Sequence, residues 1–306
     1  MRNTFADELL AAAKLDSNIV LVSGDLGFGV FDKFRAELPN QFINAGVAEQ
    51  SMMSMAAGLA SQGLRPFVYS IANFPTFRCL EQIRNDVAYM NNRVTIVSVG
   101  AGVGYGAHGY SHHAIEDIAI MRIFKEIEIY IPSDQEETTF CMSKILDSSA
   151  PSYLRLGKGG EVSLNQSFGF EHTDRQIDAS VVQGVVFWTG AIGSEVLRAL
   201  HQLEQEGLKF SALSFPEMSR NIILGALNST SNLPLLTVEE HVLEGGFGSA
   251  VLEVASDSGH NGKITRIGIN SQNKHRLGSQ SYLREINGLD ASSIAIKLKE
   301  ISNSSN

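Results

Sequence analysis

Short apolar runs alternate with longer amphipathic segments along the first half of the chain. Residues 3–15 have the periodicity of an amphipathic helix, and continuous apolar runs follow at 19–23, 66–70, 94–99, 128–131 and 153–156. Continuous apolar strands are typical of a parallel sheet covered on both faces. The segments between them predict helices at 47–62, about 75–90, 114–124 and from about Ser133, where Ser133 and Glu136 have capping-box spacing. The pattern predicts a doubly wound α/β domain over residues 1–160.

The second half repeats this alternation after a polar, glycine-containing stretch. Residues 161–180 have the composition of a linker, and residues 181–306 form a second α/β unit. Its predicted strands are 184–189, 210–214, 233–239 and 264–269, with helices at 193–206, to about Ser258, and near the end of the chain. We therefore expect two α/β domains, each with a mostly parallel sheet and helices on both faces.

The amino-acid composition argues against some classes of function. The chain has 306 residues, 43% hydrophobic and 19% charged, with a net charge of −9, which is opposite to that of a typical nucleic-acid-binding protein. The two cysteines, Cys79 and Cys141, form no metal-binding pattern and indicate a reducing compartment. The first residues have the pattern of an acidic helix start and show neither a signal peptide nor a membrane span. We expect a cytoplasmic protein.

Three stretches in the first half carry candidate chemistry. Glu49 follows a short strand and opens an apolar helix, which the helix dipole alone explains. Phe74 and Phe77 flank Pro75 and project to one side of a helix, as core residues also do. The glycine-rich loop 106–117 carries His108, His112 and His113. A metal site at His112 and His113 is not indicated, because no third ligand stands at the usual spacing.

Taken together, the order Asp25, Glu49, Phe74/Phe77 and His112 resembles the C-terminal half of transketolase. It is also similar to the same region of 1-deoxyxylulose-5-phosphate synthase and of 2-oxoacid dehydrogenase beta chains. The resemblance implies a pyrimidine-binding domain followed by a transketolase C-terminal domain, with thiamine diphosphate as cofactor. Glu49 is then the catalytic acid at the aminopyrimidine, Phe74 and Phe77 its stacking platform, and Asp25, Leu26 and Val47 further cofactor contacts. Val47, Met52 and Met53 predict apolar surroundings for Glu49, which favour a neutral carboxyl.

The same resemblance implies a sugar-binding site. His112 falls where the family has a catalytic histidine facing the reactive carbon, and His108, His113 and Arg155 fall at substrate-binding positions, Arg155 at one that binds phosphate. Three positions depart from the pattern: Leu80 replaces a third aromatic residue, His108 an aspartate, and Gly100 a phosphate-contacting histidine. We expect ketol-transfer chemistry with a relaxed or altered sugar preference.

A full transketolase also has a Gly-Asp-Gly signature for Mg²⁺ and diphosphate, with an asparagine further along. This signature does not occur in the 306 residues. The resemblance therefore implies a two-subunit enzyme, whose partner, an N-terminal transketolase subunit, carries the diphosphate-binding domain and ligates Mg²⁺. We expect a heterotetramer built on a dimer of this chain.

Two alternatives stay open at this point. A decarboxylating synthase or a dehydrogenase beta-type subunit would share most of the motifs, although the dehydrogenases carry their histidine at the position of Ser111. A non-catalytic scaffold paralogue would need neither Glu49 nor the phenylalanine pair, and both are present. The sequence leaves the donor and acceptor sugars open.

Overall fold

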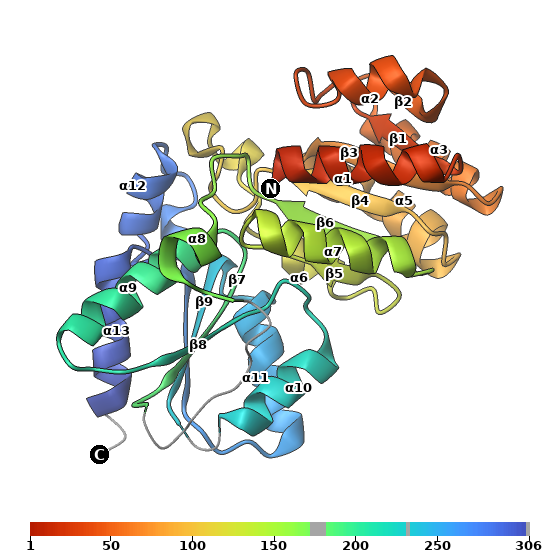
Figure 1. Ribbon diagram of the computed structural model, residues 1–306. Helices are drawn as coiled ribbons and strands as arrows, with labels where there is room; N and C mark the ends of the chain where they lie inside the picture. The colour runs from red at the N-terminus through yellow and green to blue at the C-terminus, as the bar shows by residue number, and fades with distance from the viewer. Residues whose placement is uncertain (172–181, 231–232, 304–306) are drawn as a thin grey trace.

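The computed structural model describes residues 1–171, 182–230 and 233–303, which form two parallel sheets flanked by helices (Figure 1). The first sheet has the strand order β2-β1-β3-β4-β6-β5. Its strands are β1 (Ile19–Ser23), β2 (Phe42–Asn44), β3 (Arg65–Ile71), β4 (Thr95–Val99), β5 (Glu128–Tyr130) and β6 (Ser152–Leu156). Every adjacent pair is parallel, so the carboxyl ends of the strands lie at one edge of the sheet.

The apolar runs form buried strands because helices cover both faces of this sheet. Helices α1 (Arg2–Leu15), α2 (Asp32–Glu37) and α7 (Gln135–Asp147) pack on one face. On the other face lie α3 (Glu49–Ser61), the helical segment 73–89 and α6 (Asp117–Met121). The predicted doubly wound α/β architecture is confirmed.

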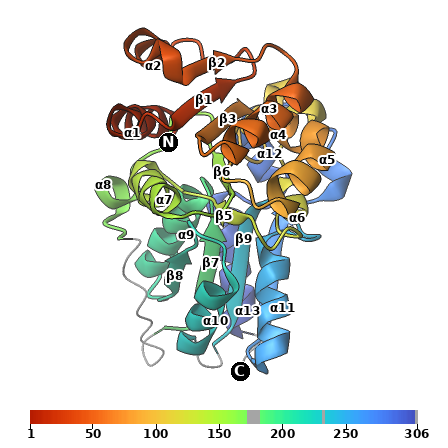
Figure 2. The same ribbon diagram turned by 90° about the vertical axis from the view of Figure 1, so that its right-hand side faces the viewer.

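The second sheet is also parallel and has the order β10-β9-β7-β8. Its strands are β7 (Val185–Thr189), β8 (Ser211–Ser214), β9 (Leu235–Val242) and β10 (Ile264–Ile269). Helices α9 (Gly193–Gln205) and α13 (Ala291–Asn303) cover one face, and α10 (Arg220–Ser229) and α11 (Phe247–Ser258) the other. Figure 2 shows the first domain above the second, with α13 directed away from the junction.

Two further short helices connect these elements. Helix α8 (Leu164–Phe168) lies in the stretch predicted as a linker, whose residues 172–180 are outside the described residues. Helix α12 (Gln280–Glu285) belongs to the closing helical region. Backbone hydrogen bonds join the domains, from the Val242 N–H to the Ile115 carbonyl (2.9 Å) and from the Ile131 N–H to the Pro216 carbonyl (2.7 Å).

Several predicted elements have different boundaries. The helix expected at about 75–90 is divided into α4 (Asn73–Thr76), a 3-10 turn (Phe77–Cys79), α5 (Leu80–Gln82) and a π-helical segment (Ile83–Tyr89). Pro75 lies in the first turn, where its missing N–H disturbs no helical hydrogen bond. Helices α2 and α10 were not predicted. Strand β9 continues to Val242, which pairs with Ile269, so Glu240 and His241 belong to a buried strand.

The capping box expected at Ser133 and Glu136 is wrong by one residue. Asp134 caps α7 by accepting the Glu137 N–H at 3.0 Å, and the Glu137 carboxylate accepts the Ser133 N–H at 2.7 Å. The Ser133 hydroxyl is engaged elsewhere, because it accepts from the Trp188 indole at 3.1 Å and bonds the Ser214 hydroxyl at 3.1 Å. A contact between the domains thus decides which residue caps the helix.

Candidate active site

The candidate residues lie on loops at the carboxyl edge of the first sheet. Strands β2 and β3 lie on opposite sides of β1, so the direction of the crossover connections reverses there. Open α/β sheets bind ligands in the crevice at such a reversal. Asp25 follows β1, Glu49 opens α3 after β2, Phe74 follows β3, and His112 follows β4. The fold therefore brings these four loops to one edge.

Glu49 is buried, with 5% of its surface exposed, and both of its carboxylate oxygens lie 3.2 Å from Nη1 of Arg78. Met52 and Met53 are fully buried in the core beneath α3. The apolar surroundings expected for Glu49 are thus only half correct, because a guanidinium lies against the carboxylate. Val47 is 75% exposed and lines a hollow of about 410 Å³ together with Glu49 and Arg78.

Phe74 presents its ring to the same guanidinium. The Cζ atom of Arg78 lies 4.0 Å from the centre of the Phe74 ring, a cation–π contact. The ring also meets His112 edge to face, with 5.3 Å between ring centres. Phe77 is 38% exposed, one turn further along. A flat cationic group therefore lies against both Glu49 and Phe74.

The histidine loop is fixed to the end of β3 by Asn73. The Asn73 amide donates to the carbonyls of His113 (2.7 Å) and Ser111 (3.1 Å). The rings of His108 and His112 lie 5.1 Å apart, and His112 Nδ1 is 3.0 Å from the Ser111 hydroxyl. Burial lowers the pKa of His112, and the neighbouring His108, His113 and Arg78 lower it further. His112 is therefore a largely neutral imidazole at neutral pH, able to exchange a proton.

His113 lies beneath the loop rather than on its surface. It is 1% exposed, its Nε2 lies 3.4 Å from the Gly106 carbonyl, and its Nδ1 has no hydrogen-bond partner among the described residues. Burial lowers the pKa of His113. Enclosed in this way, its side chain supports the loop from within.

Arg155 does not present its guanidinium to the edge of the sheet. It is 2% exposed, and its Nε lies 2.7 Å from the Asp117 carboxylate. Its Nη2 donates to the carbonyls of Ala114 (2.6 Å) and Glu240 (3.1 Å), which lie on both sides of the domain junction. The Nε and Nη2 donors of Arg155 are used internally, which argues against the phosphate-binding role expected for it.

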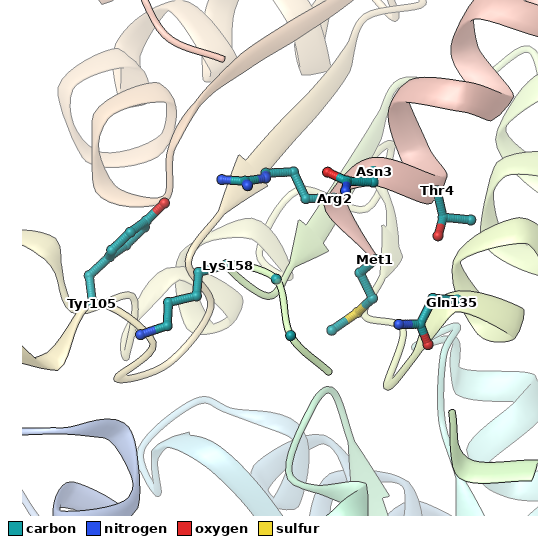
Figure 3. A pocket seen from close by; sticks show the side chains of 9 residues that line it. Met1, Arg2, Asn3, Thr4, Tyr105, Gln135 and Lys158 are labelled. Atoms are coloured by element: carbon teal, nitrogen blue, oxygen red, sulfur yellow. The ribbon is translucent and has the colours of Figure 1, made fainter. Parts of the chain in front are cut away.

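Other basic groups line a hollow beside the histidine loop. It has a volume of about 520 Å³ and is lined by Arg2, Tyr105, Lys158, Gly159 and Gly160, among others (Figure 3). Figure 3 shows the ends of Arg2 and Lys158 directed toward the side where Tyr105 lies. Neither cation forms a salt bridge with a residue in the described part of the chain. The hollow therefore has free positive charge for an anion.

Asp25 and Leu26 lie in the loop after β1. The exposed Asp25 has a φ of +59° and accepts a hydrogen bond from the Asn44 side chain at 2.9 Å, which ties the ends of β1 and β2 together. The Leu26 N–H donates to the Ser23 hydroxyl at 3.2 Å. Both residues lie at the predicted edge.

The sequence patterns did not indicate Arg2, Asn73, Arg78, Tyr105 or Lys158. Arg78 directly follows Phe77, and its position in a helical turn beside Glu49 depends on the irregular segment that replaces a regular helix. Arg2 and Lys158 are far apart in sequence, and the packing of α1 on the first sheet brings Arg2 beside the loop that follows β6. The one sequence feature that could have indicated some of these residues is that they are polar and adjoin a motif, as Arg78 adjoins Phe77.

Comparisons with known proteins agree with this geometry. Residues 1–160 match the family model of the transketolase pyrimidine binding domain, and residues 185–294 match that of the transketolase C-terminal domain. The chain belongs to the transketolase family. Its match to the first of these models over more than half of its length decides this.

Named relatives of this transketolase-family chain include separate subunits and whole enzymes. It is 34% identical over 264 residues to a subunit of apulose-4-phosphate transketolase from Phocaeicola vulgatus, covering 84% of each chain. It is 32% identical over 307 residues to 1-deoxy-D-xylulose-5-phosphate synthase 2 of Geobacter sulfurreducens, covering 97% of this chain but 48% of that protein. A solved structure described as a split gene transketolase, inactive beta4 tetramer, is similar with a TM-score of 0.84 and 28% identity, covering 99% and 98% of the two chains.

The described residues of this transketolase-family chain were compared with the patterns of metal clusters and membrane-spanning helices. They contain no group of three or more histidine, cysteine, aspartate or glutamate side chains placed to hold a metal ion. Among the same residues, no helix has both the length and the apolar character needed to cross a membrane.

Proposed function

We propose that this chain is the C-terminal subunit of a two-subunit, thiamine-diphosphate-dependent transketolase that transfers a two-carbon ketol group from a ketose to an aldose. The observation that carries the proposal is the convergence of a buried carboxylate, an aromatic face and a neutral histidine at one sheet edge. These are Glu49, Phe74 and His112. Membership of the transketolase family supports the same interpretation.

The residues fit the aminopyrimidine part of the cofactor. Arg78 is a flat group that contacts the Phe74 ring and the Glu49 carboxylate, so the site has the two partners that a flat, nitrogen-containing ring needs. In our proposal Arg78 moves aside, Phe74 and Phe77 stack on the ring, and Glu49 holds a hydrogen bond at its nitrogen. Asp25, Leu26 and Val47 border it. The cofactor, when bound, supplies a nucleophilic carbon and an electron sink.

His112 is proposed to act on the sugar. Its ring lies 5.3 Å from the Phe74 ring centre, on the side facing the loop, so it borders the space beside the cofactor. A histidine with a lowered pKa is neutral at physiological pH and can accept a proton from a hydroxyl or donate one to an oxygen. His108, exposed and beside His112, is proposed as a substrate contact, and His113 as a support for the loop.

Arg2 and Lys158 are proposed to take the role first expected for Arg155. They line the hollow beside Tyr105 without salt-bridge partners among the described residues. Paired cations in a concave site favour an anion such as a sugar phosphate. The phosphate end of a substrate would lie here, with its reacting end at His112.

The proposed partner is an N-terminal transketolase subunit that carries the diphosphate domain and ligates Mg²⁺. Exposed apolar side chains on and beside α3 and at the end of the π-helical segment support contact of this surface with another chain; they are Val47, Met55, Tyr89 and Met90. Ser54 bonds Asp86 at 3.2 Å, so the two segments form one surface. The names of the relatives, one a transketolase subunit and one a split gene transketolase, agree with this proposal. We propose a heterotetramer built on a dimer of this chain.

Calorimetric titration tests the proposal. Thiamine diphosphate and Mg²⁺ are added to the purified chain alone and to its mixture with the partner subunit. We expect weak binding and no ketol transfer for the chain alone, and tight binding with transfer for the mixture. Tight binding by the isolated chain contradicts the two-subunit arrangement. Carbon dioxide release from a 2-oxoacid donor, without transfer from a ketose, identifies a decarboxylating synthase or dehydrogenase instead.

A further inference from the structure

Tyr105 lies directly over Gly100, at the end of β4. Gly100 has a φ of +91°, and a β-carbon added to it would lie 2.1 Å from the Tyr105 ring. Such a distance is impossible for a real side chain, so the ring requires a glycine beneath it. The family's phosphate-contacting histidine is therefore not simply missing here, because a tyrosine from five residues further along fills the space above Gly100.

The ring separates two parts of the candidate site. On one side it meets His108 and His112 edge to face, with ring centres 5.8 and 6.4 Å apart. On the other side it lines the basic hollow with Arg2 and Lys158 (Figure 3). A substrate that reaches from His112 to these cations must pass Tyr105.

The Tyr105 hydroxyl is available to such a substrate. It makes no hydrogen bond with any residue in the described ranges. Burial raises the pKa of Tyr105, while the nearby Arg2 acts in the opposite direction, so the group stays protonated at neutral pH. A neutral hydroxyl offers both a donor and an acceptor, and a sugar hydroxyl can use both, whereas an ionised phosphate would use only the donor.

We propose that Tyr105 is a specificity-determining residue that hydrogen-bonds the sugar chain between the reacting end and the phosphate. This inference rests on the proposed transketolase function and adds to it a residue absent from every motif considered in the sequence. It also explains how Gly100 and Tyr105 depend on each other. Gly100→His can restore the family residue only by displacing the ring, because its β-carbon would lie 2.1 Å from it.

The test uses the complex reconstituted with its partner subunit, thiamine diphosphate and Mg²⁺. Four acceptors separate chain length from phosphate: glycolaldehyde, glycolaldehyde phosphate, ribose and ribose 5-phosphate. Tyr105→Phe removes the hydroxyl and keeps the ring. Lys158→Met is the matched control, since it removes a charge from the other side of the same hollow.

For Tyr105→Phe we expect the KM ratio of the pentoses to the two-carbon acceptors to rise roughly two- to tenfold, the loss of one hydrogen bond, with or without phosphate. For Lys158→Met the KM of ribose 5-phosphate relative to that of ribose should rise instead, because only the longer phosphorylated acceptor reaches from His112 to this cation. Gly100→Ala should reproduce the Tyr105→Phe preference, because its methyl group displaces the ring. Three outcomes for Tyr105→Phe overturn the proposal. The KM changes with the presence of the phosphate and not with chain length, it changes equally for all four acceptors, or it does not change.

A binding measurement separates this inference from the proposed function. The Kd of ribose 5-phosphate is measured by calorimetry on the same complexes, without a donor. If the wild type binds ribose 5-phosphate but transfers no ketol group, the proposed function is wrong, and the Kd still reports on Tyr105. A Kd that Tyr105→Phe leaves unchanged contradicts the role of Tyr105, even in a complex that is active as a transketolase.

Discussion

Two carboxylate–arginine pairs in the first domain have similar contacts and very different surroundings. In the pair at the sheet edge, Glu49 and Arg78 are 3.2 Å apart and the Arg78 side chain is 50% exposed. In the pair at the domain junction, Asp117 and Arg155 are 2.7 Å apart, and their side chains are 0% and 2% exposed. Arg155 also bonds two backbone carbonyls, whereas the further contact of Arg78 among the described residues is the Phe74 ring.

The difference in burial means that the first ion pair can open and the second cannot. The Arg78 guanidinium is half exposed and can exchange the buried Glu49 carboxylate for water, and ion pairs that reach the surface contribute about 0–1 kcal/mol. A buried arginine cannot do so, because its removal leaves an uncompensated carboxylate in a low-dielectric interior. The first pair can therefore open for a ligand, and the second holds the domains together. Four substitutions test this contrast.

The largest effect is expected for Glu49→Gln. Glutamine fills the same space but cannot share a proton with the cofactor ring. In the reconstituted complex, exchange of the hydrogen on the thiazolium carbon should slow by about 10⁴-fold, the upper range for loss of an acid–base group. Hydrogen–deuterium exchange followed by NMR measures this rate, with thermal unfolding as the control for an intact fold. An unchanged exchange rate removes Glu49 from the mechanism and leaves the edge pair without a catalytic role.

Arg155→Met should have the next largest effect, and on stability. It leaves Asp117 buried without its partner, which costs about 3–5 kcal/mol of unfolding free energy. Urea denaturation of the isolated chain measures this loss. The double variant Asp117→Asn with Arg155→Met should recover part of the stability, because no buried charge remains unpaired. A loss below about 1 kcal/mol, as for a surface pair, would contradict the contrast between the two sites.

For Arg155, the sequence predicted the strand but not the surroundings of the side chain. Its place on β6 was predicted, and a strand-end arginine in a matching motif indicated phosphate binding. Its burial follows from Asp117 and from the Glu240 carbonyl of the second domain, which the sequence does not place beside it. The apolar runs predicted both parallel sheets, because burial on both faces leaves a continuous pattern. By contrast, the Arg78 contact and the ring of Tyr105 over Gly100 depend on side-chain packing between loops, for which the chain has no periodic signal.

Arg78→Met should produce a smaller effect in the opposite direction. In our proposal the cofactor displaces Arg78 from Glu49 and Phe74, so removing it should tighten thiamine diphosphate binding to the complex. Loss of this half-exposed ion pair and of a cation–π contact, together about 1 kcal/mol, corresponds to a roughly fivefold lower Kd. Calorimetry measures the Kd, and unfolding of this variant should differ little from the wild type. Weaker binding would mean that Arg78 contacts the bound cofactor instead of giving way to it.

The smallest effect concerns protonation at the open edge. Burial and the neighbouring His108, His113 and Arg78 lower the pKa of His112, so it stays neutral to a lower pH than an ordinary histidine. His108→Asp replaces a ring 5.1 Å away with a negative charge, which favours the imidazolium and should raise the pKa of His112 by a fraction of a pH unit. A raised pKa means that His112 then takes up its proton at a higher pH as the solution is acidified.

NMR titration of the imidazole resonances in the isolated chain measures the shift. His241, whose pKa burial lowers to about 4, lies at the domain junction and serves as the internal control that should not move. An equal shift of both histidines would indicate a change of the whole fold, and no shift of His112 would place its ring out of reach of residue 108 in solution.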